Sequence, residues 1–337
     1  MSKNAKNWFI IIIVILLAGS FWYFTQYRAP AVTVNPPDNT DKIPPSDQSI
    51  LGCYVAKLSK DVYTLKIESE KNNNVSGMLA FNNYQKDSSA GTFTGTYEGD
   101  ILLGNYSFDS EGMHSDRQVI WKKVGNNFVE GFSAIKMVNG KEVFEDVSQV
   151  TYDPKSTFIQ SPNCLEHFID SNNTISFDYN SFFAATEGDK IPTTDWKVNS
   201  TVKGSLLANV FVPRTFLAGT NFGDARLTVG RSNNQTTIRS CSVAQAKNGD
   251  IGKGTAVIDG YPFSKFVSSG AGAGNLYETT SYRGIFDGDC YVIEYTIHSS
   301  NIGNYSPDQG IKAFDKSKIE GELEKIISSF KFLISSD

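Results

Sequence analysis

Histidine and cysteine are scarce in this chain, with three His and four Cys among 337 residues. No two cysteines have the Cys-x-x-Cys spacing of structural zinc sites, and His114, His167 and His298 stand apart from every cysteine. A zinc centre is therefore not expected, and the sequence predicts no bound cofactor.

Clusters of basic residues are also missing. Lysine and arginine number 31 against 36 acidic residues, which gives a net charge of -5. Binding to nucleic acid requires Lys/Arg patches that neutralise phosphates, so nucleic acid is excluded as a partner. The Gly-x-Ser-x-Gly elbow of serine hydrolases is absent, no cysteine stands in a nucleophile context, and no internal repeat is found.

One long apolar run is present near the N-terminus, from Trp8 to Phe24, after Lys3 and Lys6. At about 1.5 Å per residue it makes roughly 25 Å of helix, near the short limit for crossing a bilayer. The preceding lysines predict an N-terminus in the cytoplasm and C-terminal domains outside it. Residues 1–28 are therefore predicted to be a cytoplasmic stub and a single-pass membrane anchor, with membrane contact through residues 8–24.

A cleaved signal peptide is the alternative for this segment. The stretch from Leu17 to Ser20 resembles a bacterial lipoprotein signal, but Ser20 occupies the place of the lipid-bearing cysteine. The bulky residues that continue to Phe24 would obstruct a signal peptidase. An uncleaved anchor in a bacterial cell membrane is the favoured interpretation.

Proline marks the next segment, residues 29–49, which is predicted to be an extended spacer because it cannot bury a core. Roughly 290 residues follow, enough for two domains. The predicted division is a β-barrel-like domain over 50–150, a linker over 151–172 and a second domain over 173–334.

Residues 50–150 show period-two alternation, for example in Asp61–Ile67 and Gly91–Tyr97, with a strong hairpin signal at Asn139-Gly140. About eight antiparallel strands in sequential hairpins favour a meander closed into a barrel. Gly52-Cys53-Tyr54 resembles the Gly-x-Trp opening of lipocalin-like barrels. An interior filled by side chains is favoured over a hollow one that holds a small apolar ligand.

The second domain places its strands first and one amphipathic helix, Ser317–Phe330, last, with Ser317 and Glu320 as a capping box. This order predicts an α+β sandwich and an α+β fold class overall. Together with the segment from Ile327 to Phe332, it makes residues 174–333 resemble the PsbP/Mog1-like superfamily of α/β/α sandwiches. The resemblance implies a non-enzymatic binding or assembly module, often found in exported proteins.

Four cysteines in a chain expected to be exported suggest two disulfides. The favoured pairs are Cys241 with Cys290, both in or beside predicted strands, and Cys53 with Cys164. The other two pairings and buried free thiols are the alternatives.

The predicted strand from Cys290 to Ser299 places Glu294 and His298 on one face. Glu278, Tyr282 and Arg283 of the preceding strand could meet them and form an acid/base constellation or an anion site. The competing interpretation is a solvated row of polar residues on an ordinary strand.

Two weaker candidates lie elsewhere. Asp109, Glu111 and Asp116 offer oxygen ligands for Ca²⁺, although they lack the EF-hand register and also fit a polar turn. Gly272 and Gly274 belong to a glycine-rich stretch that is predicted to be a flexible loop beside a binding groove rather than a phosphate cradle.

Two functions follow from these observations. The favoured one is a membrane-anchored extracytoplasmic module of the bacterial cell envelope that binds a partner protein, an envelope polymer or a small apolar ligand without transforming it. The alternative is an exported hydrolase-type enzyme with a cleft in the C-terminal domain.

Overall fold

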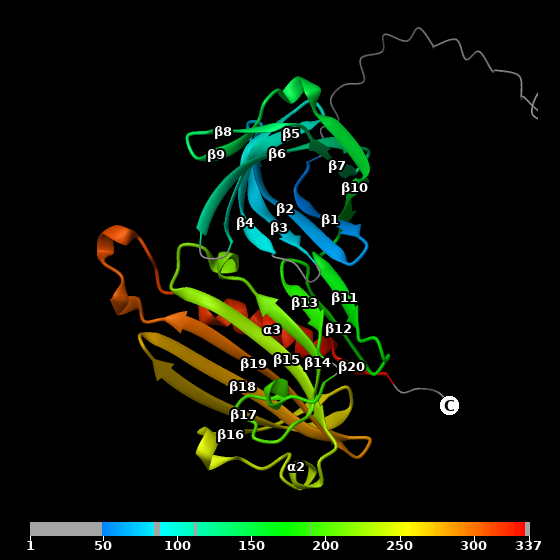
Figure 1. The fold of residues 1–337 in the computed structure, drawn as a ribbon, viewed down its shortest axis with the longest axis vertical. Helices are drawn as coiled ribbons and strands as arrows, with labels where there is room; N and C mark the ends of the chain where they lie inside the picture. Colours follow the sequence, from blue (N-terminus) through cyan, green and yellow to red (C-terminus); the bar gives the residue numbers. More distant parts are fainter. Residues whose placement is uncertain (1–48, 84–87, 111–112, 190, 334–337) are drawn as a thin grey trace, which may run out of the picture. The chain divides into compact units, whose positions relative to one another are not determined.

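The described part of the protein is mostly β-structure. A computed structural model describes residues 49–83, 88–110, 113–189 and 191–333 (Figure 1). These ranges contain twenty strands against two α-helices, so the predicted α+β class is wrong. The physical reason is that period-two alternation runs through nearly every segment, and one 14-residue helix does not make a layer of its own.

The predicted membrane anchor cannot be compared with this structure. The apolar run 8–24 lies outside the described residues. Within the described ranges, no helix combines the length and the apolar character needed to cross a bilayer.

The first half is an eight-stranded antiparallel barrel, which β5 closes by pairing with β6. A hairpin of β8 and β9 extends the sheet through a parallel pairing of β9 with β6. The strands are β1 (Gly52–Leu58), β2 (Asp61–Lys71), β3 (Asn74–Asn82), β4 (Ser89–Glu98), β5 (Ile101–Ser110), β6 (Met113–Val124), β7 (Asn127–Phe132), β8 (Ile135–Val138), β9 (Lys141–Phe144) and β10 (Thr151–Ser161).

Aromatic side chains fill much of the barrel interior. Phe93 and Phe158 meet the Trp121 ring edge-on, at centroid distances of 5.5 and 5.9 Å, and all three are fully buried. These side chains alternate with outward-facing residues along their strands, which is the pattern that predicted the barrel.

The barrel extends further along the chain than expected. Residues 151–172, predicted to be a linker, contain β10 and the next strand, β11 (Leu165–Ile169). β10 pairs with both β1 and β7 and places Phe158 in the barrel core. The barrel is therefore closed by β10, which lies within the segment that was predicted to be a linker.

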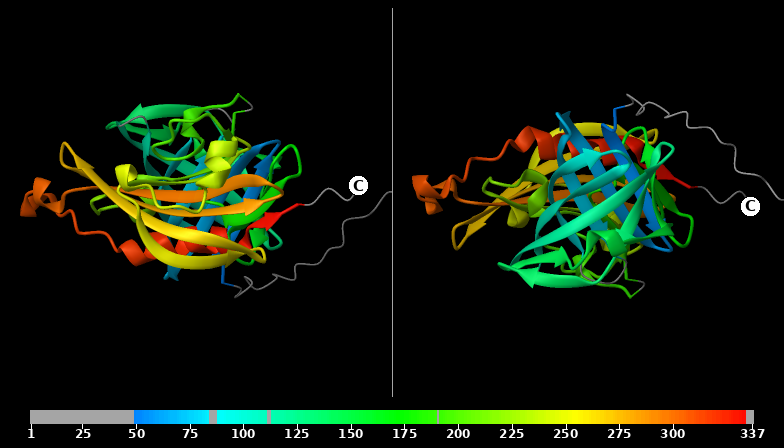
Figure 2. Two further views of the ribbon diagram at one scale, coloured as in Figure 1. Left: turned by 90° about the horizontal axis from the view of Figure 1, so that it is seen from below. Right: turned by 90° about the horizontal axis from the view of Figure 1, so that it is seen from above.

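The second half contains a three-stranded and a seven-stranded sheet (Figure 1). In the larger sheet the order is β13-β14-β15-β19-β18-β17-β16, and β16 to β19, yellow to orange, run side by side in Figure 2. The strands are β12 (Ile175–Asn180), β13 (Ala184–Glu187), β14 (Ser205–Val212), β15 (Phe222–Ser232), β16 (Ile251–Ile258), β17 (Tyr261–Gly272), β18 (Asn275–Phe286), β19 (Asp289–Ser300) and β20 (Lys331–Phe332).

Helix α3 (Lys316–Ser329) is the helix that the sequence predicted. It buries Ile319, Leu323, Ile326 and Ile327 in the core of the second half. Its N-cap is Asp315, whose side chain accepts from the Ser317 N–H, so the predicted capping box at Ser317 is wrong. The remaining helices are α2 (Gln235–Arg239) and the 3₁₀ turns Val147–Gln149, Thr194–Trp196, Arg214–Leu217, Ala246–Asn248, Ile302–Asn304 and Pro307–Gln309.

Polar contacts and a disulfide join the two halves. Thr64 and Asn82, on β2 and β3, donate to the Ser181 carbonyl oxygen at 3.1 and 2.9 Å. Cys53 is bonded to Cys164, with 5.4 Å between their Cα atoms. The described residues accordingly belong to one compact unit.

Candidate functional site

The two faces of the seven-stranded sheet differ in character. Helix α3 packs on one face, where Tyr282 donates to Glu324 at 2.6 Å and Glu278 meets Lys316 at 2.8 Å. The opposite face carries the side chains that alternate with these, including Glu294 and His298 of β19. The predicted shared face of Glu294 and His298 is therefore present.

The predicted constellation itself is not assembled. Glu278 and Tyr282 lie on the α3 face, away from Glu294 and His298. Arg283 does share the face of Glu294. His298 is four residues from Glu294, or roughly 13 Å along the strand. The residues divide into a buried ionic cluster around Glu294 and a more exposed group around His298.

The buried cluster lies beneath two loops. Arg283 forms a bidentate pair with Asp250, at 2.6 and 3.1 Å, and both side chains are at most 5 % exposed. One oxygen of Glu294 accepts from the Val198 N–H, and Lys197 is buried nearby. Asp250 and Lys197 were not predicted as site residues, because both lie in loops without periodicity.

Burial changes the titration of these groups. It raises the pKa of Glu294 and lowers the pKa of Lys197, because both charged forms lose hydration. Burial also acts to raise the pKa of Asp250, but hydrogen bonds from Arg283 and from the Gln245 N–H outweigh it and hold the pKa of Asp250 below its usual value. The Cys241–Cys290 disulfide, with a Cα–Cα distance of 5.7 Å, packs with Trp196 beside this cluster. Both disulfides match the favoured pairing.

The His298 group lies at the other end of the same face. Nδ1 of His298 is 2.9 Å from Asp224, and Nε2 is 3.0 Å from Asn275. Tyr277 stacks on the imidazole with ring centroids 4.8 Å apart and planes inclined by 11°. Gly223 permits this arrangement, since a Cβ there would lie 2.6 Å from Nδ1 of His298.

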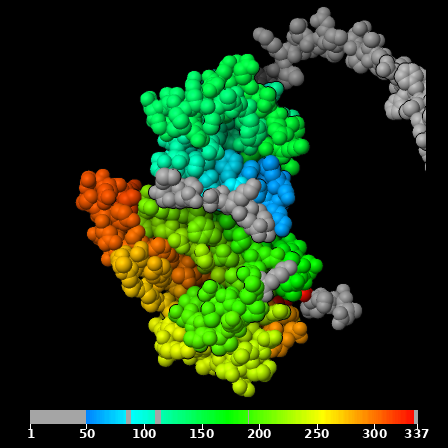
Figure 3. All heavy atoms as spheres, in the orientation of Figure 1, coloured from blue at the N-terminus to red at the C-terminus, as the bar shows by residue number. Residues whose placement is uncertain are grey.

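One flank of Tyr277 is open. Its cross-strand neighbour on β17 is Gly270, which has no side chain, and a Cβ added there would meet nothing within 4 Å. Tyr277 is 41 % exposed. The segment around residues 270–310, orange in Figure 3, reaches the molecular surface in that view. The arrangement is an aromatic platform supported by His298 and flanked by polar groups.

The two weaker candidates have different outcomes. Of the three predicted Ca²⁺ ligands, Asp109 is the last residue but one of β5, and Glu111 lies outside the described residues. The Asp116 carboxylate is 3.6 Å from the Lys141 ammonium group. Among the described residues no group of three His, Cys, Asp or Glu is arranged to hold a metal ion.

The glycine-rich stretch is less loop-like than expected. Gly272 ends β17, and Gly274 lies in the tight turn to β18 with φ of +80°. Its carbonyl oxygen accepts from Asn304 at 3.2 Å, so this end of the sheet is held by the loop after β19.

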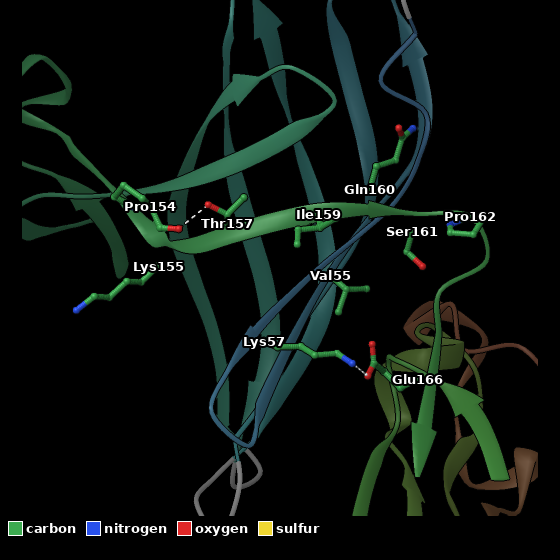
Figure 4. A pocket seen from close by; sticks show the side chains of 10 residues that line it. All are labelled: Val55, Lys57, Pro154, Lys155, Thr157, Ile159, Gln160, Ser161, Pro162 and Glu166. Atoms are coloured by element: carbon green, nitrogen blue, oxygen red, sulfur yellow. Dashed lines mark hydrogen bonds and ion pairs between the residues drawn. The ribbon is translucent and has the colours of Figure 1, made fainter.

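A surface hollow of about 500 Å³ lies on the outer side of β1 and β10 (Figure 4). Val55 and Ile159 provide apolar lining, and Lys57 pairs with Glu166 at 2.5 Å on its rim. No sequence pattern indicated this hollow, because its lining comes from β1 and from β10, Pro162 and β11, which lie apart from β1 in the sequence.

The comparisons with known proteins do not assign this chain to a family. No family model matches the chain, and no curated protein matches it. A solved structure from Bacteroides thetaiotaomicron is similar at 11 % identity and a TM-score of 0.30, over 51 % of this chain and 50 % of that one. This chain thus spans about half the length of that protein.

Two structures of the type VI secretion immunity protein TplEi from Pseudomonas aeruginosa also match over 85 % of this chain and 99 % of theirs. The complex with the "L" peptide has 11 % identity and a TM-score of 0.25, and the apo form has 12 % and 0.23. The resemblances to PsbP and to lipocalins stay predictions.

Proposed function

We propose that this protein is an extracytoplasmic binding module of the bacterial envelope that recognises a glycan-type surface polymer without transforming it. The observation that carries this proposal is the Tyr277 ring, which is stacked on His298 and open on its other flank. The membrane run 8–24 would hold the module at the cell membrane.

The platform has the chemistry that a sugar ring requires. The C–H face of a sugar packs on an aromatic ring, and its peripheral hydroxyls need hydrogen-bond donors and acceptors. Asp224 and Asn275 flank the imidazole and offer oxygen acceptors. Arg226, exposed on β15 two residues from Asp224, offers donors.

The sheet face also suits an extended ligand. The next row across the strands holds Arg226, Thr296 and Thr279, and the two threonine hydroxyls are 2.8 Å apart. A polymer lying along the strands would pass from the aromatic row to the hydroxyl row. Glu278 is paired with Lys316, and Glu294 accepts from the Val198 N–H. These two carboxyls are on opposite faces of the sheet and do not form a catalytic pair, which agrees with a binding role.

The two disulfides support an oxidising compartment, because such bonds persist mainly outside the cytoplasm. The proposal is tested by co-sedimentation of the full chain, in detergent, with insoluble envelope polysaccharide isolated from the source cells. Saturable retention that free oligosaccharide competes away is expected. Retention that is equal on an unrelated insoluble polysaccharide would contradict the proposal.

A further inference from the structure

Two polar side chains are buried side by side inside the barrel. Trp121 on β6 and Glu130 on β7 are directly opposed in the antiparallel register. Cross-strand partners share a face of the sheet, with Cβ atoms about 5 Å apart. Trp121 belongs to the barrel core, so Glu130 also faces the interior, and the residues are 0 % and 7 % exposed.

The indole N–H of Trp121 has no hydrogen-bond partner among the described residues. Trp121 Nε1 is fully buried without an acceptor, and the neighbouring Glu130 is 7 % exposed. An unsatisfied buried group costs about 1–3 kcal/mol, so the Trp121 N–H beside a buried carboxyl calls for an explanation.

The surroundings favour an anionic partner. The indole N–H can only donate a hydrogen bond. Arg117 precedes Trp121 by four residues on the same face of β6, with its guanidinium 5.7 Å from the Phe108 ring centroid and Nε 2.6 Å from Glu142. Burial raises the pKa of Glu130 to about 7, against the opposing charge of Arg117, so near neutral pH a large share of this carboxyl is protonated and can donate.

We propose that Trp121 Nε1 and the Glu130 carboxyl form the polar end of an internal ligand site that takes the carboxylate head of a small amphiphile. The indole N–H and the protonated carboxyl each donate a hydrogen bond to one oxygen of the ligand carboxylate. The positive charge of Arg117 stabilises the negative charge of the ligand. This site goes beyond the proposed polymer binding and is independent of it.

The barrel interior limits the size of the ligand. Phe93 and Phe158 already pack against the Trp121 ring, so a short apolar chain fits this chemistry better than a long lipid. Binding also depends on the proton of Glu130. Other titratable groups near it are Arg117 of β6 and Tyr63 of β2, whose own pKa is raised by burial and in part by Glu130, while Glu142 of β9 faces Arg117.

The test is calorimetric titration of the full chain, in detergent, with hexanoate at pH 6 and pH 8. Hexanoate stays ionised at both pH values, so any change reports on the protein. Because the protonated fraction of a group with pKa about 7 falls about tenfold between these values, the affinity is expected to fall about tenfold. The isosteric variant Glu130→Gln keeps a donor and is expected to bind equally at both pH values.

Trp121→Phe keeps the ring and removes the N–H, and is expected to bind about tenfold more weakly at pH 6. Glu98→Gln, an exposed acid on β4, serves as the matched control and should bind like the wild type. Absence of hexanoate binding at pH 6, preferential binding of hexylammonium, or an unchanged pH dependence in Glu130→Gln would each overturn the proposal.

Discussion

Tyr277 lies flat on His298, with ring centroids 4.8 Å apart, although 21 residues separate them in the sequence. The antiparallel pairing of β18 with β19 makes them direct cross-strand neighbours. Gly270 on the far side leaves one flank of the tyrosine ring uncovered. This relationship supports a binding surface on the sheet face that α3 does not cover.

The support that His298 gives to Tyr277 can be tested by two substitutions. His298→Ala removes the stacked ring, which is worth about 0.5–1.5 kcal/mol, so polymer affinity is expected to fall up to about tenfold. His298→Phe keeps an aromatic ring and is expected to stay within about threefold of the wild type. The measurement is a binding isotherm for each variant.

These two variants also address the enzyme alternative. An enzyme that uses the imidazole would lose a hydrolytic activity in both variants alike, because phenylalanine cannot transfer a proton. Loss of such an activity in His298→Phe with unchanged polymer binding would contradict a purely structural role for His298.

The buried carboxyl of Glu130 predicts a pH-dependent stability. Its pKa is raised from 4.5 in the unfolded chain to about 7 in the fold, so its stabilising effect is complete below pH 4.5 and is lost as the pH rises through about 7. The shift corresponds to about 3 kcal/mol. Urea unfolding should show Glu130→Gln close to the wild type at pH 4.5 and more stable by up to about 3 kcal/mol at pH 8.

The exposed acid Glu98 is the control for this measurement, and Glu98→Gln should follow the wild type at both pH values. A Glu130→Gln variant that gains no stability at pH 8 would show that the carboxyl is not buried in its charged form.

The Arg283–Asp250 pair predicts a strong asymmetry between single and double substitutions. Arg283→Met leaves the Asp250 carboxylate buried without its partner, and a loss of about 3–5 kcal/mol in the free energy of unfolding is expected. The double variant Arg283→Met, Asp250→Leu removes both charges and should recover much of that loss. A double-mutant cycle by chemical denaturation measures the coupling, and additive losses would argue against a direct pair.

The Cys241–Cys290 disulfide closes a loop with a sequence separation of 49 residues. On the chain-entropy model its removal costs about 4 kcal/mol. Cys241→Ser with Cys290→Ser should therefore unfold at lower urea concentration under oxidising conditions. The same double variant should equal the wild type once both are reduced, and a remaining difference would indicate a packing effect of the serines.

Period-two alternation predicted the strands well where the chain is regular. It placed Glu294 and His298 on one face because strand geometry is local. The helical spacing of Ile319 and Leu323 likewise predicted α3. The predicted α+β fold class was wrong because the prediction counted the single helix α3 as a separate helical layer.

Features that depend on long-range register were not predictable. Residues 151–172 were predicted to be a linker because Pro154, Pro162 and Asn172-Asn173 lie in a stretch without sustained periodicity. The structure shows a register shift in β10 between Tyr152 and Thr157. Glu130 could be placed inside the barrel only through its pairing with Trp121. In each case, tertiary contacts supply the information that the local pattern lacks.

The most direct test of the binding surface is the affinity of the full chain for envelope polysaccharide in three forms: wild type, Tyr277→Ala and Phe132→Ala. Phe132 of β7 is a matched aromatic control, 46 % exposed against 41 % for Tyr277. We expect Tyr277→Ala to lose at least about tenfold in affinity at unchanged thermal stability, as for an aromatic contact residue, while Phe132→Ala binds normally. Equal binding by all three forms would contradict the account.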